Sequence, residues 1–154
     1  MNSPSSVDAP DAGGAVGVVV VGHGETATHL LRAAEGIASP GSLDGVIALD
    51  AGVGDSAAFS ASMCAALDEV DRGQGVLLLV DLVGASPCQC GHREGKTHHI
   101  VVLSGLNLAM LLKLSSLERT SATAQELAQA CASSGQRSVC ISPPPPCPPT
   151  QADA

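Results

Sequence analysis

Three short stretches of the sequence place reactive side chains directly after apolar runs. His23 stands between two glycines after four valines, and Asp81 follows the run "GVLLLV". The tripeptide "GAS" at 84–86 comes next and ends in the hydroxyl of Ser86. An imidazole, a carboxylate that can orient it and a small turn rich in backbone N–H groups are what a phosphoryl-accepting histidine requires. The sequence therefore indicates a histidine that takes up a phosphoryl group.

These residues can meet only if the apolar runs before them are neighbouring parallel strands. Unbroken valine-rich and leucine-rich runs indicate strands buried on both faces, as in a parallel sheet. Helical stretches follow them, which predicts an α/β fold: an open, doubly wound sheet of four parallel strands with helices on both faces. The expected strands are 16–21, 44–50, 75–81 and 99–105, and the expected helices are 25–38, 59–70, 107–114 and 123–135.

In such a sheet the carboxyl ends of the strands gather at one edge, and ligands bind where the strand order reverses. His23 would begin a helix, whose unpaired N–H groups and dipole favour an anion. Asp81 would accept the N–H of one ring nitrogen and leave the other nitrogen free as the nucleophile. Taken singly, these residues are more simply a helix start, a strand-end acid and a turn. Their joint occurrence at equivalent strand ends favours a site.

The composition allows one folded domain and excludes some classes of partner. The chain has 154 residues, enough for one domain with a proper core and too few for two. We expect a leader at 1–15, the folded domain at 16–141 and a proline-rich tail at 142–154. Phe59 is the one aromatic residue, so the core must be aliphatic. The net charge of −8 argues against nucleic acid and anionic membranes as partners.

The leader and the apolar runs bear on the cellular compartment. Residues 1–15 lack the basic and apolar regions of a signal peptide. The longest apolar run, at 101–112, is shorter than the roughly 20 residues that a transmembrane helix requires. We therefore expect a cytoplasmic protein. Because the cytoplasm is reducing, the six cysteines of the protein should be thiols.

A metal-binding or redox module is a rival interpretation of one segment. Its ligands would come from Cys88, Cys90, His92, His98 and His99. Structural zinc sites more often use C-x-x-C pairs, and adjacent histidines at the start of a strand point to opposite faces. Solvated histidines and reduced thiols are the simpler interpretation. We expect no metal and no cofactor.

Four motifs occur in an order that resembles a known family. "VVVVGHGE", "LDAGVGDS", "GVLLLVDLVGASP" and "VVLSGLNLAMLL" are similar to the mannose-family EIIA domain of the bacterial phosphoenolpyruvate-dependent sugar phosphotransferase system. In that family the histidine of the HG motif accepts a phosphoryl group from the carrier protein HPr and passes it to an EIIB component, which implies His23 here. The resemblance implies that Asp81 orients this histidine. It assigns contacts with the phosphoryl group to Gly24, Gly84, Ala85 and Ser86.

The resemblance, which runs from Gly17 to Ile141, also implies partners and an assembly. HPr and EIIB would be direct partners, and a membrane sugar permease an indirect one. The family exchanges its last strand between the subunits of a homodimer, where it pairs antiparallel at the sheet edge. This implies a short antiparallel edge strand at 138–141. Positioning and N–H donors would carry the transfer without a metal.

Three alternatives use the same residues. "HGET" matches most of the signature of the histidine phosphatases, but those enzymes need an arginine before the histidine, where this chain has Gly22. The phosphotransferase subunit of the dihydroxyacetone kinase system has a similar fold and is phosphorylated on the equivalent histidine. Its usual motifs at the ends of the first and third strands differ from those of this chain. A regulatory module that binds partners according to the phosphorylation of His23 is the third. We favour the sugar-transport carrier.

Overall fold

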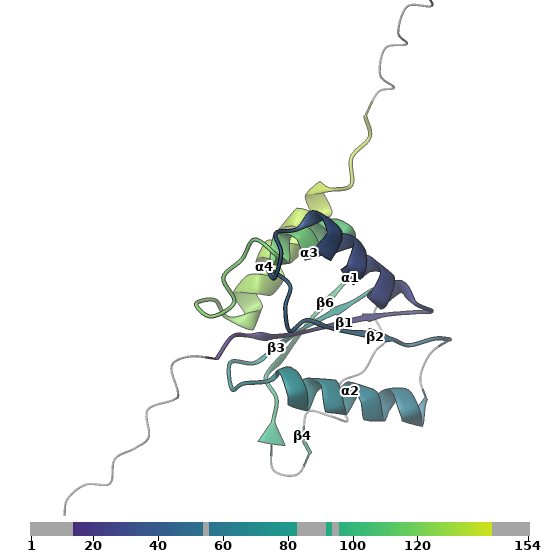
Figure 1. The fold of residues 1–154 in the computed structure, drawn as a ribbon, viewed down its shortest axis with the longest axis vertical. Coiled ribbons are helices and arrows are strands. Elements are labelled where there is room, and N and C mark those ends of the chain that lie inside the picture. Colours follow the sequence, from purple (N-terminus) through teal and green to yellow (C-terminus); the bar gives the residue numbers. More distant parts are fainter. Residues whose placement is uncertain (1–13, 54–55, 83–91, 94–95, 143–154) are drawn as a thin grey trace, which may run out of the picture.

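The fold is an α/β sandwich built on one parallel sheet (Figure 1). The computed structural model describes residues 14–53, 56–82, 92–93 and 96–142. Four parallel strands lie in the order β2-β1-β3-β6, which confirms the predicted class. Their bounds are β1 (Gly17–Gly22), β2 (Ile47–Asp50), β3 (Val76–Val80) and β6 (Ile100–Ser104).

Helices cover both faces of this sheet (Figure 1). Helix α2 lies alone on one face, and the other three pack together on the opposite face. Their bounds are α1 (Thr26–Ile37), α2 (Ala57–Val70), α3 (Leu108–Leu114) and α4 (Ala124–Arg137). Among the described residues, no helix is both long and apolar enough to span a membrane.

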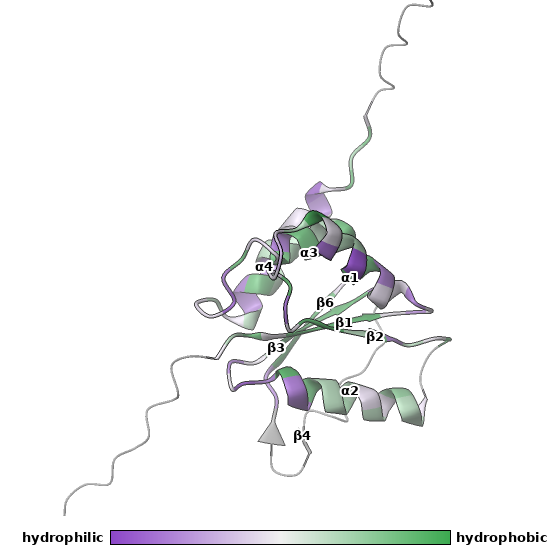
Figure 2. Ribbon diagram, viewed as in Figure 1, coloured by the Kyte–Doolittle hydropathy of each residue, from purple (hydrophilic) through white to green (hydrophobic). Residues whose placement is uncertain are grey.

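The two central strands bury both of their faces, as their unbroken apolar sequences predict. Alternate residues of β1 and β3, such as Val18 and Leu77, pack towards α1, α3 and α4, while Val19 and Leu78 pack towards α2. All four are fully buried, and Figure 2 shows the sheet as an apolar layer between the helices. A slip of one residue between these strands would exchange the two sets of side chains, so dense packing on both faces fixes the register.

The predicted start of the last helix is confirmed in atomic detail. The Thr123 hydroxyl accepts the N–H of Glu126 at 3.2 Å, and the Glu126 carboxylate accepts the N–H of Thr123 at 2.8 Å. This reciprocal pair satisfies two N–H groups that a helix leaves without a partner in its first turn.

The outer strand on one side of the sheet is more exposed to solvent than its apolar sequence suggests. The expected fourth strand is β6, but it is only partly buried because it lies at the edge, and Val102 is 47% exposed. The expected edge strand at 138–141 is absent from this single chain, where Val139 and Ile141 are exposed. Because an exchanged strand needs a second subunit, the antiparallel edge strand stays a prediction.

Two further observations concern the segment before β6 and the cysteines. Short strands β4 (His92–Arg93) and β5 (Lys96–Thr97) pair antiparallel in a separate ladder. The expectation that all six cysteines are thiols is wrong for Cys64, which is disulfide-bonded, whereas Cys131 and Cys140 are free. Sequence spacing does not reveal which cysteines come close enough in space to be bridged.

A buried histidine joins the end of α2 to the start of β6, at the amino end of the sheet. In His98, Nδ1 lies 2.7 Å from an Asp71 carboxylate oxygen and Nε2 lies 2.9 Å from one of Asp68. The His98 side chain is only 6% exposed. The hydrogen bond to Asp71 raises the pKa of His98 and outweighs the burial that would lower it, and Asp68 adds to the increase. Both ring nitrogens can donate only when the imidazole is protonated.

His98 should therefore stabilise the fold more at acid than at alkaline pH. A raised folded-state pKa gives stability that is fully present below the unfolded pKa of about 6.5 and is lost as the pH rises through the folded pKa. In urea unfolding, His98→Gln should reduce the free energy of unfolding more at pH 6 than at pH 9. His29→Gln, at a mostly exposed histidine, is the control. If His98→Gln reduced the free energy of unfolding equally at pH 6 and pH 9, this prediction would be wrong.

Candidate functional site

The turn that carries His23 leaves no room for a side chain before the histidine. At Gly22, a Cβ would lie 2.8 Å from the backbone nitrogen of Ala27 and 2.9 Å from Cβ of Thr26. The first turn of α1 is therefore packed directly against the end of β1. An arginine at this position, which a histidine phosphatase needs, would collide with the helix, so the structure argues against that alternative.

The turn is also tied to the neighbouring strand. Gly24 has a φ of +59°, which favours glycine, and its N–H donates to the carbonyl oxygen of Gly52 at 2.7 Å. The N–H of Ala51 donates to the carbonyl oxygen of Gly22 at 2.8 Å. Since its N–H is engaged in this way, Gly24 contributes turn geometry, and its predicted contact with a phosphoryl group stays a prediction.

Asp81 binds both the backbone and the ring of His23. Its Oδ2 accepts the N–H of His23 at 2.7 Å, and its Oδ1 lies 3.0 Å from the ring Nδ1. The backbone of Asp81 is fixed in turn, because its N–H donates to Val21 at 3.2 Å and its carbonyl accepts the N–H of Gly105 at 3.3 Å. The structure thus brings together the two residues that the sequence placed at the ends of β1 and β3.

The charge of Asp81 decides how the imidazole is oriented. Partial burial alone would raise its pKa, but hydrogen bonds from the His23 N–H, the His23 ring and the Leu82 N–H outweigh this and hold the pKa below its usual value. An ionised carboxylate accepts and does not donate. We therefore assign the ring proton to Nδ1, which leaves the lone pair on Nε2.

The ring of His23 is half exposed at the carboxyl ends of the strands. The His23 side chain is 52% exposed, whereas that of Asp81 is 20% exposed. Two large apolar side chains, Val53 and Leu82, are also exposed where β2 and β3 lead away from this edge. A shallow hollow of about 450 Å³, lined by Glu25, Thr26, His29 and Leu30, lies alongside on α1. A half-exposed imidazole at an open edge suits transfer between proteins better than a buried small-molecule reaction.

Three of the predicted phosphoryl contacts lie outside the described residues. These are Gly84, Ala85 and Ser86. Their place in the chain, shortly after Asp81, keeps them candidates.

Sequence reasoning missed one carboxylate at this edge. Asp50 ends β2, opposite Gly22 in the β1–β2 register, and its Oδ1 accepts the N–H of Thr28 at 3.1 Å. Glu25, the N-cap of α1, makes no such side-chain bond. The signal was present in the sequence, because Asp50 ends its apolar run just as Asp81 does.

The rival metal site finds no support in the described residues. Cys88 and Cys90 lie outside them, and both ring nitrogens of His98 are bound to carboxylates. Across the described part of the chain, no three His, Cys, Asp or Glu side chains are grouped so as to hold a metal ion.

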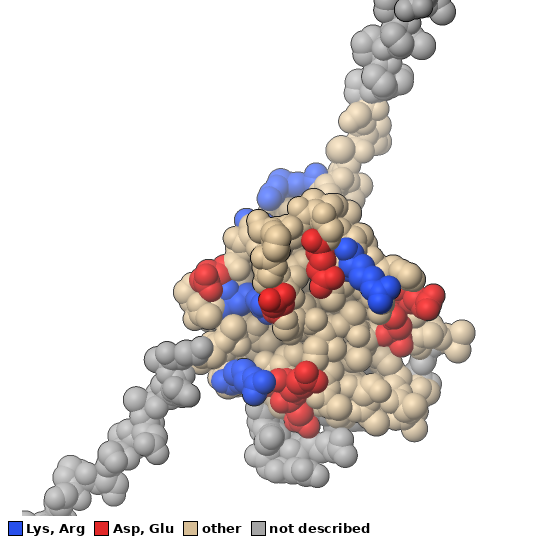
Figure 3. All heavy atoms as spheres, viewed as in Figure 1, with Lys and Arg blue, Asp and Glu red and all other residues tan. Residues whose placement is uncertain are grey.

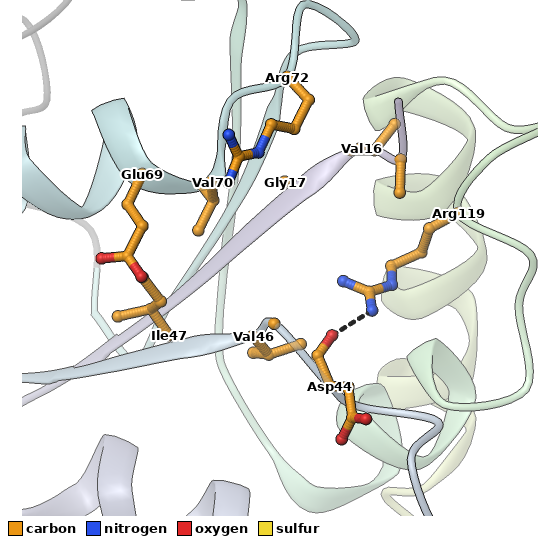
Figure 4. A pocket seen from close by; sticks show the side chains of 11 residues that line it. Val16, Gly17, Asp44, Val46, Ile47, Glu69, Val70, Arg72 and Arg119 are labelled. Carbon is orange, nitrogen blue, oxygen red and sulfur yellow. Dashed lines mark hydrogen bonds between the residues drawn. The ribbon is translucent and has the colours of Figure 1, made fainter. Parts of the chain in front are cut away.

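Another hollow, of about 460 Å³, lies at the amino ends of the strands, opposite the end that carries His23 (Figure 4). It contains neither His23 nor Asp81. Arg72 and Arg119 line it together with Asp44 and Glu69, and the guanidinium of Arg119 donates to the carbonyl oxygen of Asp44 at 2.5 Å. On the face shown in Figure 3, basic and acidic side chains are likewise interspersed. Because acidic side chains accompany the two arginines, this hollow offers no purely basic surface that would bind a phosphoryl group.

Known proteins share both sequence motifs and the fold with this chain. A family model, EIIA-man, described as "PTS system fructose IIA component", matches residues 17–131. A crystal structure of a phosphotransferase system component EIIA from Streptococcus agalactiae is 27% identical, with a TM-score of 0.62, and the match covers 82% of this chain and 96% of that one. No curated protein matches significantly.

Two further structures extend the comparison. A mannose/sorbose specific IIA subunit of the phosphotransferase system from Enterococcus faecalis is 25% identical, with a TM-score of 0.64, and the match covers 85% of this chain and 97% of that one. A sigma-54 interaction domain protein from Enterococcus faecalis has a TM-score of 0.65 over 82% of this chain and 94% of its own. Its identity of 15% shows a shared fold alone.

The close packing at Gly22 gives a testable prediction. Gly22→Ala should reduce the free energy of unfolding by about 1–3 kcal/mol, because the added methyl group must displace the backbone of α1. Gly36→Ala, within α1 and with open space around the added Cβ, is the control and should raise the free energy of unfolding by about 0.4–1 kcal/mol. Urea unfolding of both variants measures this. A Gly22→Ala protein as stable as the wild type would contradict the packing described.

Proposed function

We propose that this chain, which belongs to the EIIA-man family of phosphotransferase-system IIA components, carries the phosphoryl group on Nε2 of His23. Proteins of this family are phosphoryl carriers with transferase activity. One observation carries the assignment to His23. Asp81 holds Nδ1 at 3.0 Å while the ring stays half exposed, so Nε2 is the nitrogen that can react.

The proposed reaction is an in-line transfer between two histidines. The donor is phospho-HPr: as the N–P bond to Nε2 of His23 forms, the N–P bond to the HPr histidine breaks. The Nδ1 proton stays in the hydrogen bond to Asp81, whose negative charge stabilises the ring while it carries the phosphoryl group. The same steps run onward to an EIIB component, which accepts the group. In this proposal neither a metal nor a cofactor takes part.

The segment that follows β3 in the sequence completes the proposed site. We assign the binding of the phosphoryl oxygens to the backbone N–H groups of Gly84 and Ala85 and to the Ser86 hydroxyl. A nest of N–H groups carries only partial positive charge. It stabilises the phosphoryl group less than an arginine would, which suits a carrier that must release what it accepts.

We further propose that the protein serves a mannose-type system and that it forms a homodimer. The likeness to the mannose/sorbose subunit supports the first. The open edge of β6 supports the second, since Val102 is exposed there and the chain after α4 carries exposed Val139 and Ile141. In the proposed dimer, residues 138–141 of each copy pair antiparallel with β6 of the other and cover these side chains.

Mass spectrometry tests the central assignment. After incubation with phosphoenolpyruvate, enzyme I and HPr, the wild type should gain the mass of one acid-labile phosphoryl group. His23→Ala should gain none, because the nucleophile is gone, and His29→Ala, at an exposed histidine on the neighbouring helix, should gain one. A folded wild type that stays unmodified would overturn the proposed function, and a phosphorylated His23→Ala protein would overturn the assignment to His23.

A further inference from the structure

Asp50 lies beside the His23 turn and has no role in the transfer described above. It pairs with Gly22 in the β1–β2 register, and the two backbone hydrogen bonds of Ala51 and Gly24 join the same segments. Its Oδ1 accepts the N–H of Thr28, in the first turn of α1, at 3.1 Å. The carboxylate is therefore held at the amino end of α1, on the same edge of the sheet as the imidazole.

A structural role explains part of this arrangement. The N-cap residue, Glu25, makes no side-chain hydrogen bond to the helix, so Asp50 does this work from a neighbouring strand. The side-chain oxygen of an asparagine is neutral and can accept an N–H from the same position as a carboxylate oxygen. Capping therefore requires the oxygen of Asp50 but not its charge.

The charge matters once His23 carries a phosphoryl group. The unpaired N–H groups at the start of a helix and the positive end of its dipole stabilise a bound anion. Asp50 removes one of these donors by binding the N–H of Thr28. Asp50 also pairs in the β1–β2 register with Gly22, the residue before His23, so its negative charge is on the side of the site where a phosphoryl group would arrive, and like charges repel. Both effects raise the free energy of the phosphorylated protein relative to the unphosphorylated one.

We propose that Asp50 sets the phosphoryl-transfer potential of phosphorylated His23. This inference rests on the proposed function. Asp50 acts through the phosphoryl group's surroundings and takes no part in bond making: the N–P bond forms and breaks at Nε2, and no proton moves to or from Asp50. It keeps the group readily transferable to the next carrier, whereas Asp81 orients the ring that reacts.

The test separates the charge of Asp50 from its capping oxygen. Asp50→Asn keeps an oxygen that can accept the N–H of Thr28 and removes the charge. The equilibrium constant for phosphoryl transfer from phospho-HPr to this variant should rise about fivefold, the upper end of what an interaction between exposed charges contributes. Intact-mass measurement of both phosphoproteins at equilibrium gives the constant. Because Asp50 is exposed, the increase should shrink in high salt.

Two further variants keep the test decisive. Asp44→Asn removes the same charge from an exposed position at the amino ends of the strands, far from His23. It should leave the constant within about twofold of the wild type. Asp50→Ser is a second neutral variant, with a shorter side chain, and should also raise the constant, so a folding defect in one variant does not decide the result. A constant equal to that of the wild type in folded Asp50→Asn and Asp50→Ser would leave Asp50 only its capping role and overturn the inference. A wild type that accepts no phosphoryl group overturns the proposed function and this inference with it.

Discussion

The hydrogen bonds between Asp81 and His23 are the interaction on which the rest of the site depends. One carboxylate fixes the backbone of the turn through the His23 N–H and the orientation of the ring through Nδ1. These bonds exist only while β1 and β3 keep the register that pairs Val21 with Val80. That register is held by apolar packing on both faces of the sheet, so the core of the protein and its chemistry share one constraint.

The geometry of the site fits the proposed role of a carrier that passes a group on. The imidazole is half exposed, and packing against α1 excludes any side chain at position 22. The negative charge of Asp81 orients the ring. The carboxylate of Asp50 lies at the amino end of α1, where the helix would otherwise stabilise an anion. A site with strong positive charge would bind the phosphoryl group more tightly, but it would release it more slowly.

Much of this could be predicted from the sequence, because the signals were strong and local. Valine and leucine runs identified the central strands, and their alternation with helices placed His23 and Asp81 at one edge. Contacts that depend on a third element were not predictable. The bond from Asp50 to Thr28 requires the β1–β2 register, and the binding of His98 by two aspartates requires the end of α2 to meet β6. The exposure of β6 likewise depends on the order of strands, which single runs do not encode.

The central claim is that Asp81 keeps the ring proton on Nδ1 and so makes Nε2 the nucleophile. Long-range ¹H–¹⁵N NMR spectra of the histidine rings, recorded at mildly alkaline pH for the wild type and Asp81→Asn, test it most directly. The account predicts the Nδ1–H tautomer of His23 in the wild type and a shift towards Nε2–H in the variant, because an asparagine NH₂ group can donate to Nδ1. A wild-type His23 with its proton on Nε2 would contradict the account.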